Sequence, residues 1–537
     1  MQFDDIVKEI GGFGRYQIVL VMLVMFPQIL ISIQALLPVF ILSNHDHWCQ
    51  IQLEKDALKN NVTSYIEQNH FGDIKSYVTL NTSQCSVDVF INGTNNTQTD
   101  VCSSWTYDTR ELTRSPISDF NLVCDDAVLT QHASMVFLGG NLFGSFMLGS
   151  VGDTWGRKIV MYIGAILLFG SSLANAWSVN YIMFVTLRFI SGAATISCIG
   201  SAMIIVFESV DSDHRSHAAV AVELAWCLGE VILSGAAYFL RDWRQLQIAV
   251  SSPGVLLFLY WFLMPESARW FLSKGNGKEA MRIAQRAARV NGKTIEIDIR
   301  KVNLQHHQSK HEITPVFKSF RLLFRFTVVL ILWFVLALSY YGLTFSVGRI
   351  GHNVYLDFII YAVLEMVAYI SCLFINTRFG RKPLNVGAFL LAGVACVAST
   401  MVSLYAGGDN GWLIITLSAI GRMGVSTVFA NIFVYTSELF PTTIRSFILA
   451  VCNVFTRLGA VIAPYISAMS TDNELSNTSL TFGVLSLVAG VLSCFLPETL
   501  NTKLPDSMED IQTVTENVDE HQTKTNQISG GTSSQHS

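Results

Sequence analysis

Ionisable side chains stand at several places inside long apolar stretches of this sequence, where a charge is costly and marks function by default. Arg457 lies eleven residues past Ser446, in a stretch that contains no acidic residue. A guanidinium in such a place needs an acid from another helix, a hydrated cavity or an anionic ligand. The position of Arg457 alone leaves these three possibilities open and makes it a candidate substrate-binding residue.

Three acids lie in other apolar stretches. Glu223 and Glu230 are seven residues apart, about two helical turns, and therefore share one helix face. Two carboxylates at membrane depth can carry protons, bind a cationic group or balance an arginine. Glu365 invites the same three interpretations. We favour the balancing role, which leaves a structural pair between Arg457 and one of these acids as the alternative to substrate binding.

The stretches that hold these residues are long enough to cross a bilayer. Of the 537 residues 51% are hydrophobic and only 14% are charged, whereas soluble domains carry about 25% charged residues. The net charge of -5 gives no basic surface for a nucleic acid, so we expect no such partner. Apolar stretches of roughly 20 residues predict an all-α membrane protein with twelve spans. The spans lie near 16–42, 130–150, 159–179, 182–207, 216–240, 245–264, 326–346, 354–375, 384–405, 411–436, 446–470 and 479–496.

The polar segment 43–129 between the first two spans has the composition of an extracellular loop. It holds four glycosylation sequons and four of the ten cysteines, and this combination indicates an oxidising compartment. We expect two disulfides, whose pairing stays open. The cysteines are Cys49, Cys85, Cys102 and Cys124, and the acceptors are Asn61, Asn81, Asn92 and Asn95, with a fifth, Asn477, before the last span.

An extracellular 43–129 loop places both termini in the cytosol, and basic residues should then gather in the cytosolic loops. Most of them do, and Arg241 and Arg244 are the exceptions, predicted outside. The expected cytosolic set comprises Arg157, Lys158, Arg215, Arg378, Arg381, Lys382 and Arg445. The chain then divides into a cytosolic start (1–15), the first span (16–42), the loop (43–129), spans two to six (130–264), a cytosolic connection (265–325), spans seven to twelve (326–496) and a disordered tail (497–537).

The cytosolic connection 265–325 is basic and shows helical periodicity. Apolar residues recur at Ala280, Ile283, Ala287 and Val290, which predicts short amphipathic helices under the bundle. The tail is rich in Ser, Thr, Gln and Glu and lacks apolar periodicity, which is typical of disorder.

Three motifs occur twice, at nearly one offset, and indicate two homologous halves of six spans. A Gly-Arg-Lys motif starts at Gly156 and again at Gly380, and a Pro-Glu pair starts at Pro265 and again at Pro497. An acid precedes an arginine by seven residues in both halves: the pairs are Glu208 with Arg215 and Glu438 with Arg445. A chain of this kind binds its substrate near the midplane between the halves and works by rocking them, which is alternating access.

The loop from Gly149 to Lys158 resembles the signature loop of the major facilitator superfamily. Five further motifs resemble the organic cation, anion and zwitterion transporter family (solute carrier family 22) within it. They are Trp105 to Tyr107 followed by Phe120 to Cys124, Pro265 to Trp270, Tyr340 to Gly342, Tyr435 to Pro441, and Arg445. The resemblance runs from about Gly14 to Pro505 and implies the major facilitator fold of two pseudo-symmetric six-helix halves.

Charged residues at the predicted cytosolic helix ends are candidate gate residues. Asp153 with Arg157 and Lys158 can form charge-assisted bonds that hold the inward-closed state and break when it opens. In the second half Arg381 and Lys382 recur, but Thr377 replaces the acid, which predicts a weaker latch. The pairs Glu208 with Arg215 and Glu438 with Arg445 are expected to bond at helix ends, unless their arginines only anchor the topology.

The resemblance also implies a substrate class. Family members that carry organic anions or carnitine-like zwitterions have arginine at the position of Arg457, whereas typical cation carriers have aspartate. Organic-anion carriers tend to have a basic residue at the position of Tyr369, so tyrosine there looks more like the zwitterion branch. One arginine with several acids nearby fits a zwitterion or a monocarboxylate better than a dianion.

The resemblance places aromatic residues in the cavity, where flat π faces accept varied solutes. Each can instead pack between helices or face lipid. Gln28 and Gln34 in the first span are polar and can line the cavity or bond between helices. The aromatic candidates are Trp226, Tyr340, Tyr341, Phe429 and Phe433.

The sequence therefore predicts a polyspecific plasma-membrane transporter of small organic ions, for which a monomer is sufficient. We expect no cofactor and no metal, contact with membrane lipid and a possible co- or counter-ion. The alternatives are a carrier of organic cations or carnitine-like solutes and, in another class, a membrane receptor without transport. An ion channel or an enzyme is disfavoured, because no span shows a carbonyl filter and the loop histidines lack the spacing of a catalytic or metal site.

Overall fold

The computed structural model describes most of the chain outside the long loop, the connection and the tail. The described residues are 3–43, 46–49, 78–82, 85–91, 97–102, 104–109, 112–211, 214–293, 320–350, 353–405, 411–468 and 475–500. The tail after residue 500 and the connection between 294 and 319 lie outside this range, as do Asn61, Asn92 and Asn95.

A helical segment occupies each of the twelve predicted spans. Ten stretches of the described chain are long and apolar enough to cross a membrane, by length and composition. The first six segments are α2 (Arg15–Leu36) with α3 (Pro38–Ile41), α6 (Val128–Trp155), α7 (Arg157–Asn175), α8 (Tyr181–Ser209), α9 (Arg215–Phe239), and the series α10 (Trp243–Ser251), η4 (Ser252–Leu259) and α11 (Tyr260–Leu263). The last six are α15 (Phe320–Ile350), α16 (Val354–Phe379), α17 (Arg381–Tyr405), α18 (Gly411–Leu439), α19 (Thr442–Ala468) and α20 (Leu475–Ser493).

Proline accounts for two departures from a continuous helix. α2 ends at Leu36 and the chain resumes as α3 at Pro38, although Leu37 between them keeps helical φ and ψ. The break arises because Pro38 has no N–H with which to continue the hydrogen bonds of α2. The sixth span passes from α10 directly into the 3₁₀ segment η4, which has a proline in its first turn. This proline has no N–H with which to continue the hydrogen bonds of α10.

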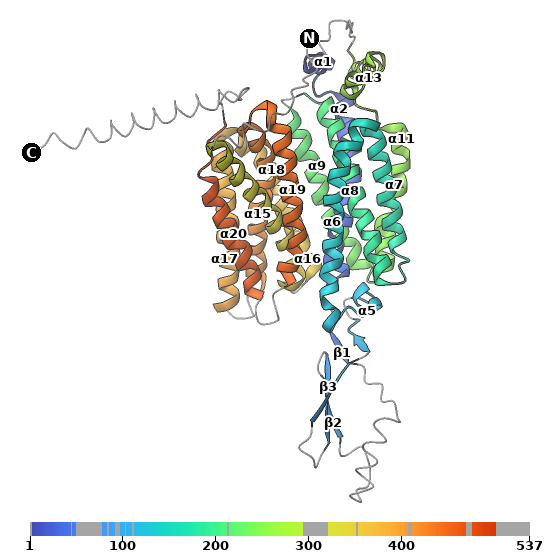
Figure 1. Ribbon diagram of the computed structural model, residues 1–537, viewed down its shortest axis with the longest axis vertical. Helices are drawn as coiled ribbons and strands as arrows, with labels where there is room; N and C mark the ends of the chain where they lie inside the picture. The colour runs from blue at the N-terminus through green and yellow to red at the C-terminus, as the bar shows by residue number, and fades with distance from the viewer. Residues whose placement is uncertain are drawn as a thin grey trace, which may run out of the picture.

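The helices form two groups that lie side by side (Figure 1). We call α2 to α11 the N-half and α15 to α20 the C-half. Figure 1 also places α1 (Phe3–Ile10) and α13 (Gly277–Val290) beyond one end of the bundle, here named the α13 end, and the β-strands beyond the other, named the loop end. Spans that follow one another in the chain run in opposite directions between these two ends.

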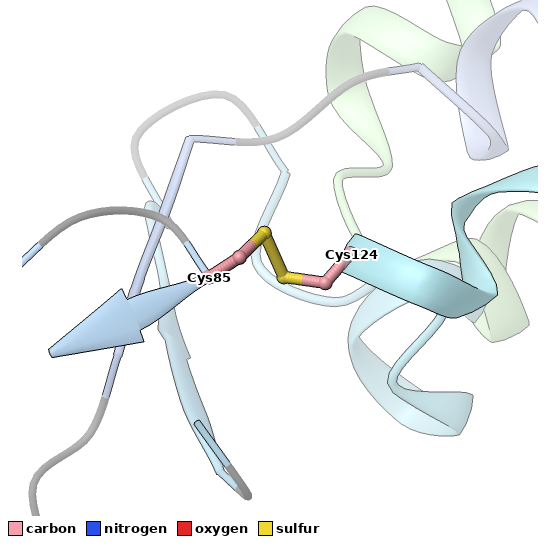
Figure 2. The surroundings of a disulfide bond; sticks show 2 residues. All are labelled: Cys85 and Cys124. Carbon is pink, nitrogen blue, oxygen red and sulfur yellow. A yellow bond between two sulfur atoms is a disulfide. The ribbon is translucent and has the colours of Figure 1, made fainter. Parts of the chain in front are cut away.

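The first loop builds two small antiparallel sheets at the loop end. The outer sheet has the order β2-β3-β4 (Val78–Thr82, Ser86–Ile91, Thr97–Val101) and the inner one pairs β1 (His47–Cys49) with β5 (Trp105–Tyr107). Cys85 and Cys124 form a disulfide with a Cα–Cα distance of 5.7 Å, which ties the outer sheet to the start of α6 (Figure 2). Cys102 is disulfide-bonded as well, so three of the four loop cysteines take part in disulfides in this structure.

Arg244, one of the two basic residues predicted on the unexpected side, is held by the loop. Its Nη2 donates to Asp119 Oδ2 at 3.1 Å and to the carbonyl of Ser178 at 2.9 Å, and its Nη1 donates to the carbonyl of Ala176. Asp119 lies in α5 (Pro116–Phe120) and also accepts from Trp243 Nε1. A neutralised arginine of this kind contributes little to the charge bias that orients a membrane protein.

The connection after the N-half contains α12 (Ala268–Ser273) and α13, as its periodicity predicts. Ala280, Ala284, Ala287 and Ala288 are buried, and the last three pack against Ile10 of α1. Val290 was expected on this apolar face but is 45% exposed, because at about 100° per residue it is turned away from the centre of the face that these alanines form. Two of the five predicted glycosylation acceptors lie within the described residues: Asn81 in β2 and Asn477 in the first turn of α20.

Candidate functional site

Six side chains from four helices meet at mid-depth in what we call the central cluster. Arg422 of α18 donates through Nη2 to Glu230 Oε1 of α9 at 2.5 Å and to Glu365 Oε2 of α16 at 2.6 Å. The same Nη2 lies 3.1 Å from the hydroxyl of Tyr340 in α15. The remaining members donate to the acids: Tyr340 and Tyr369 bond Glu365 Oε1 at 3.0 and 2.9 Å, and Trp226 Nε1 bonds Glu230 Oε1 at 3.2 Å.

The three charged side chains of the central cluster have no exposed surface. Charge is tolerated there because each ion faces its opposite and accepts or donates further hydrogen bonds. The guanidinium also lies over two rings, 4.8 Å from the centroid of Tyr340 and 5.4 Å from that of Tyr361. Some polar atoms of the central cluster nevertheless form no hydrogen bond: Nε and Nη1 of Arg422 and Oε2 of Glu230 have no partner.

The central cluster joins the two halves. Glu230 and Trp226 belong to the N-half, whereas Arg422, Glu365 and Tyr340 belong to the C-half, and Trp226 Nε1 also lies 2.9 Å from the hydroxyl of Tyr340. On the loop-end side of the cluster, α9 donates from the hydroxyl of Ser234 to the carbonyl of Tyr355 in α16 at 2.7 Å. The two halves therefore meet through polar contacts at mid-depth as well as through apolar packing.

This arrangement corrects the expected partner of the buried acids. Glu230 was predicted to balance Arg457, and the same role was one of three interpretations left open for Glu365, but both acids bond Arg422 instead. Arg422 lies eleven residues into the span 411–436, so the criterion that singled out Arg457 also applies to it and was not used. Arg188 in α8, 2% exposed and stacked 5.0 Å from the ring centroid of Phe137, was overlooked in the same way.

Arg457 and Glu223 remain as the unpaired charges of this region. Arg457 of α19 is partly exposed, interacts with the hydroxyl of Tyr341, and its Nε has no partner. Glu223 of α9 is also partly exposed, and the described residues offer its carboxylate no hydrogen bond or ion pair. Tyr341 lies within electrostatic range of both. An unpaired cation and an unpaired anion thus flank one tyrosine beside the central cluster.

The aromatic candidates divide into two sets. Tyr340 and Tyr341 are buried and contact each other, and Phe429 lies 5.9 Å from Tyr340 between ring centroids. Phe433 is 45% exposed and packs on Trp333, 6.1 Å away. Phe433 therefore lies apart from the contacts of the central cluster, while Phe429 joins them.

The two glutamines of the first span differ in their surroundings. Gln34 Nε2 donates to Ser251 Oγ, and Gln34 Oε1 accepts from Gln247, within the N-half. This is the interhelical bonding that was the alternative to a cavity position. Gln28 is buried and its Oε1 has no partner, so its acceptor remains available.

The three motifs repeated in the sequence come together at the α13 end of each half. In the N-half, Glu266 accepts from the backbone N–H groups of Arg157 and Lys158 at 3.2 and 3.1 Å. Arg157 pairs with Asp153 at 3.0 Å and with Glu208 at 3.8 Å, and Glu208 accepts from the hydroxyl of Ser267. We call this set the N-half network.

The C-half repeats the arrangement. Glu498 accepts from the backbone N–H groups of Arg381 and Lys382 at 3.0 and 3.1 Å. Arg381 pairs with Glu438 at 3.1 Å, and Glu438 accepts from the hydroxyl of Thr499 at 2.6 Å. We call this set the C-half network. The side chain of Thr377, the expected weak point of this half, lies outside the described residues.

These networks correct the expected partners at the helix ends. Glu208 and Glu438 were predicted to pair with Arg215 and Arg445, but their ion pairs are with Arg157 and Arg381. Arg215 donates to the carbonyl of Phe207, and Arg445 donates to that of Phe440. Lys158 places its ammonium 5.0 Å from the ring centroid of Trp261.

The acids that cap α7 and α17 were missed as site residues. Burial raises the pKa of Glu266 despite three backbone hydrogen bonds and the charge of Arg157. At Glu498 burial also raises the pKa, but four backbone N–H donors outweigh it and hold the pKa below its usual value. Both acids belong to the repeated Pro-Glu motif, so the repeat itself was the signal that could have found them.

Each network depends on a glycine. Gly156 and Gly380 have φ of 106° and 99°, and a Cβ at either position would collide with the carboxylate of Glu266 or Glu498. We expect Gly156→Ala and Gly380→Ala to destabilise the protein by about 2 kcal/mol each through backbone strain, and by more through the collision. The melting temperature of the purified full-length protein measures this.

Matched controls lie in the helices that follow. Gly170 in α7 and Gly387 in α17 have ordinary helical φ and open space where a Cβ would stand. Their alanine variants should leave the melting temperature unchanged or raise it, because alanine favours helix. Equal melting temperatures for Gly380→Ala and Gly387→Ala would contradict the role given to the C-half network.

Arg422 provides a second prediction. Arg422→Met should cost about 3 to 5 kcal/mol, since it leaves two carboxylates buried without their cation. Adding Glu230→Gln and Glu365→Gln to that variant should recover a large part of the loss, because the excess charge is then removed. Arg457→Met is the control and should change the melting temperature little. A smaller loss for Arg422→Met than for Arg457→Met would show that the central cluster does not stabilise the fold.

Comparison with known proteins agrees with this architecture. Residues 71–510 match the family model for sugar (and other) transporters. The chain is 30% identical to an organic cation transporter protein of Drosophila melanogaster, over 95% of this chain and 94% of that protein. It is also 30% identical to human solute carrier family 22 member 13, over 95% and 93%, and 28% identical to a beta-alanine transporter of Drosophila melanogaster, over 96% and 90%.

Solved structures support the fold. The xylose transporter XylE of E. coli, in a partially occluded inward-open conformation, matches 91% of this chain and 100% of its own, with a TM-score of 0.62 and 15% identity. The predicted major facilitator fold is thereby confirmed, and the chain belongs to solute carrier family 22, a family of multi-pass membrane transporters of organic ions and not of enzymes.

Proposed function

We propose that this transporter carries small organic solutes with a carboxylate, and that zwitterions suit its site best. The observation that carries the proposal is the pair of unpaired charges beside Tyr341. Arg457 supplies a cation for a carboxylate and Glu223 an anion for an ammonium group. Because no ion pair joins the two side chains, a zwitterion that spans them would satisfy both at once.

The charge of the central cluster favours a zwitterion over a dianion. Arg422 already faces two carboxylates and has no positive charge to spare. A dianion would therefore meet a single free cation, Arg457, with Glu223 repelling it from the other side. A simple cation would meet Glu223 but would have to leave Arg457 uncompensated.

The names of the relatives allow both charge classes, since one is an organic cation transporter protein and another a beta-alanine transporter. Beta-alanine is a zwitterion, with a carboxylate and an ammonium group three bonds apart along its carbon chain. It is therefore a suitable first probe for a site that offers one charge of each sign.

Alternating access can use the two networks and the central cluster together. The N-half and C-half networks each lie within one half and would keep its helix ends rigid while the halves rock. The central cluster joins the halves at mid-depth and would act as the contact around which they move. Both chain ends would face the cytosol at the plasma membrane, with the disulfide-bonded and glycosylated loop outside.

Uptake of three labelled probes tests the charge assignment: beta-alanine, a simple monocarboxylate and a quaternary ammonium cation. Arg457→Ala should lower beta-alanine and monocarboxylate uptake about tenfold or more, the loss expected for a charge-assisted hydrogen bond. Glu223→Gln should lower beta-alanine uptake and spare the monocarboxylate. Arg378→Ala, which removes an exposed cation at the α13 end, is the control and should leave all three unchanged.

Three results would count against the proposal. If the wild type moved only the cation, the substrate would be cationic. Carboxylate uptake that survived Arg457→Ala would remove that residue from the site. Binding of beta-alanine without any flux would favour a receptor.

The central cluster also suggests a proton as the coupling ion. Two carboxylates face one guanidinium without exposure, and an uncompensated charge in such a place is costly. Glu365 uses both oxygens and accepts three hydrogen bonds. Glu230 has one oxygen without a partner, so Glu230 is the acid that would hold a proton in this state. The titratable neighbours are Glu223, Cys227, Tyr340 and Tyr369.

Proteoliposomes with an imposed pH gradient test this coupling. Uptake by the wild type should change with the gradient and lose this dependence when a protonophore collapses it. Glu230→Gln, which mimics the protonated acid, should retain exchange of substrate across the membrane but show no response to the gradient. Glu279→Gln, an acid of α13 outside the membrane helices, is the control. A gradient response that persists in Glu230→Gln would exclude this acid as the proton carrier.

A further inference from the structure

A groove of about 770 Å³ lies at the α13 end of the N-half, between the membrane helices and α13. Lys158 and Ile159 of α7 and Trp261 of α11 line the side toward the membrane, with Trp155 at the end of α6. Arg286 and Arg289 line the side toward α13. The groove lies on the periphery of one half and shares no residue with the central cluster.

The α13 side of the groove is basic because of how α13 is built. Its alanines are buried against α1 and α12, which turns its long basic side chains outward. Arg282, Arg286 and Arg289 follow one another at spacings of four and three residues and therefore share a face. Lys158 completes the set from the membrane side, and Arg286 lies close enough to repel its charge.

The acids in the groove do not cancel these cations. Glu266 is occupied by the backbone N–H groups at the start of α7. Glu279 pairs with Arg282 at 3.7 Å. Among the described residues no carboxylate forms an ion pair with Arg286, Arg289 or Lys158. Glu266 attracts Lys158 electrostatically, but neither arginine has an acidic partner of its own.

The membrane side of the groove is apolar and open. Trp155, Ile159 and Trp261 are 59%, 36% and 43% exposed, and they lie at the ends of membrane helices. Exposed tryptophan at a span end is typical of the boundary between acyl chains and headgroups. Lys158 lies over the ring of Trp261, so the basic and apolar sides of the groove meet at this pair.

We propose that this groove binds the phosphorylated headgroup of an anionic membrane lipid, whose acyl chains run along Trp155, Ile159 and Trp261. A phosphate placed between Lys158, Arg286 and Arg289 would relieve their mutual repulsion, as basic pockets at a membrane surface do for inositol lipids. The apolar side explains why a lipid fits better than a soluble phosphate. The evidence for this lipid site comes from the groove alone. It does not depend on which solute the transporter carries.

Native mass spectrometry of the full-length protein in detergent tests the site, with phosphatidylinositol 4-phosphate as the probe and phosphatidylcholine as the neutral reference. The wild type should bind phosphatidylinositol 4-phosphate more tightly than phosphatidylcholine. Added NaCl should weaken the binding of the anionic lipid. Arg286→Gln with Arg289→Gln should lower the affinity about 30-fold, since each basic residue near a membrane surface contributes about fivefold.

The matched control is Lys274→Gln with Lys278→Gln, which removes the same charge from this connection but outside the groove lining. This pair should change the affinity less than threefold, and both pairs should keep the melting temperature of the wild type. Equal losses in the two pairs, or wild-type binding that is insensitive to NaCl, would overturn the site. Equal affinity for the deacylated headgroup or for inorganic phosphate would overturn the assignment to a lipid.

Discussion

Placing one arginine between two carboxylates in a region without exposed surface is the interaction on which this structure depends. Arg422, Glu230 and Glu365 come from three helices and two halves. Each ion is too costly to bury alone, so the halves must bring their charges together whenever this region is closed. The cluster therefore constrains how α9 of the N-half can sit against α16 and α18 of the C-half, and any rocking motion has to preserve or exchange these bonds.

The N-half and C-half networks meet a different requirement, which is to keep the helices of each half together. A half can rock as a unit only if its own helices stay together. The N-half network ties four segments of its half to each other, and the C-half network ties three. Both use a carboxylate to cap the first backbone N–H groups of a helix, where the helix dipole favours a negative charge. Gly156 and Gly380 allow the carboxylate to approach because they have no side chain and tolerate positive φ.

Structural features that depend on residues close in sequence, or that occur in both halves, could be predicted from the sequence. Span length and composition located the twelve helical segments, and the repeat marked the residues of both end networks before their partners were known. The pairing of Arg422 was beyond such reasoning, because its two acids lie 192 and 57 residues away and on other helices. Glu208 and Arg215 were paired because they are close in sequence, whereas the fold brings Arg157 to Glu208 from another helix.

The contrast between Arg422 and Arg457 shows why a membrane arginine needs its surroundings before it can be assigned a role. Both lie deep within a span, and only the structure shows that the acids of the neighbouring helices have bonded Arg422. This leaves Arg457 and Glu223 partly exposed beside Tyr341, where water or a ligand must supply what the protein does not. Under the function proposed above, the central cluster acts on substrate recognition indirectly: it occupies the neighbouring charges, so that Arg457 and Glu223 have no ion-pair partner among the described residues.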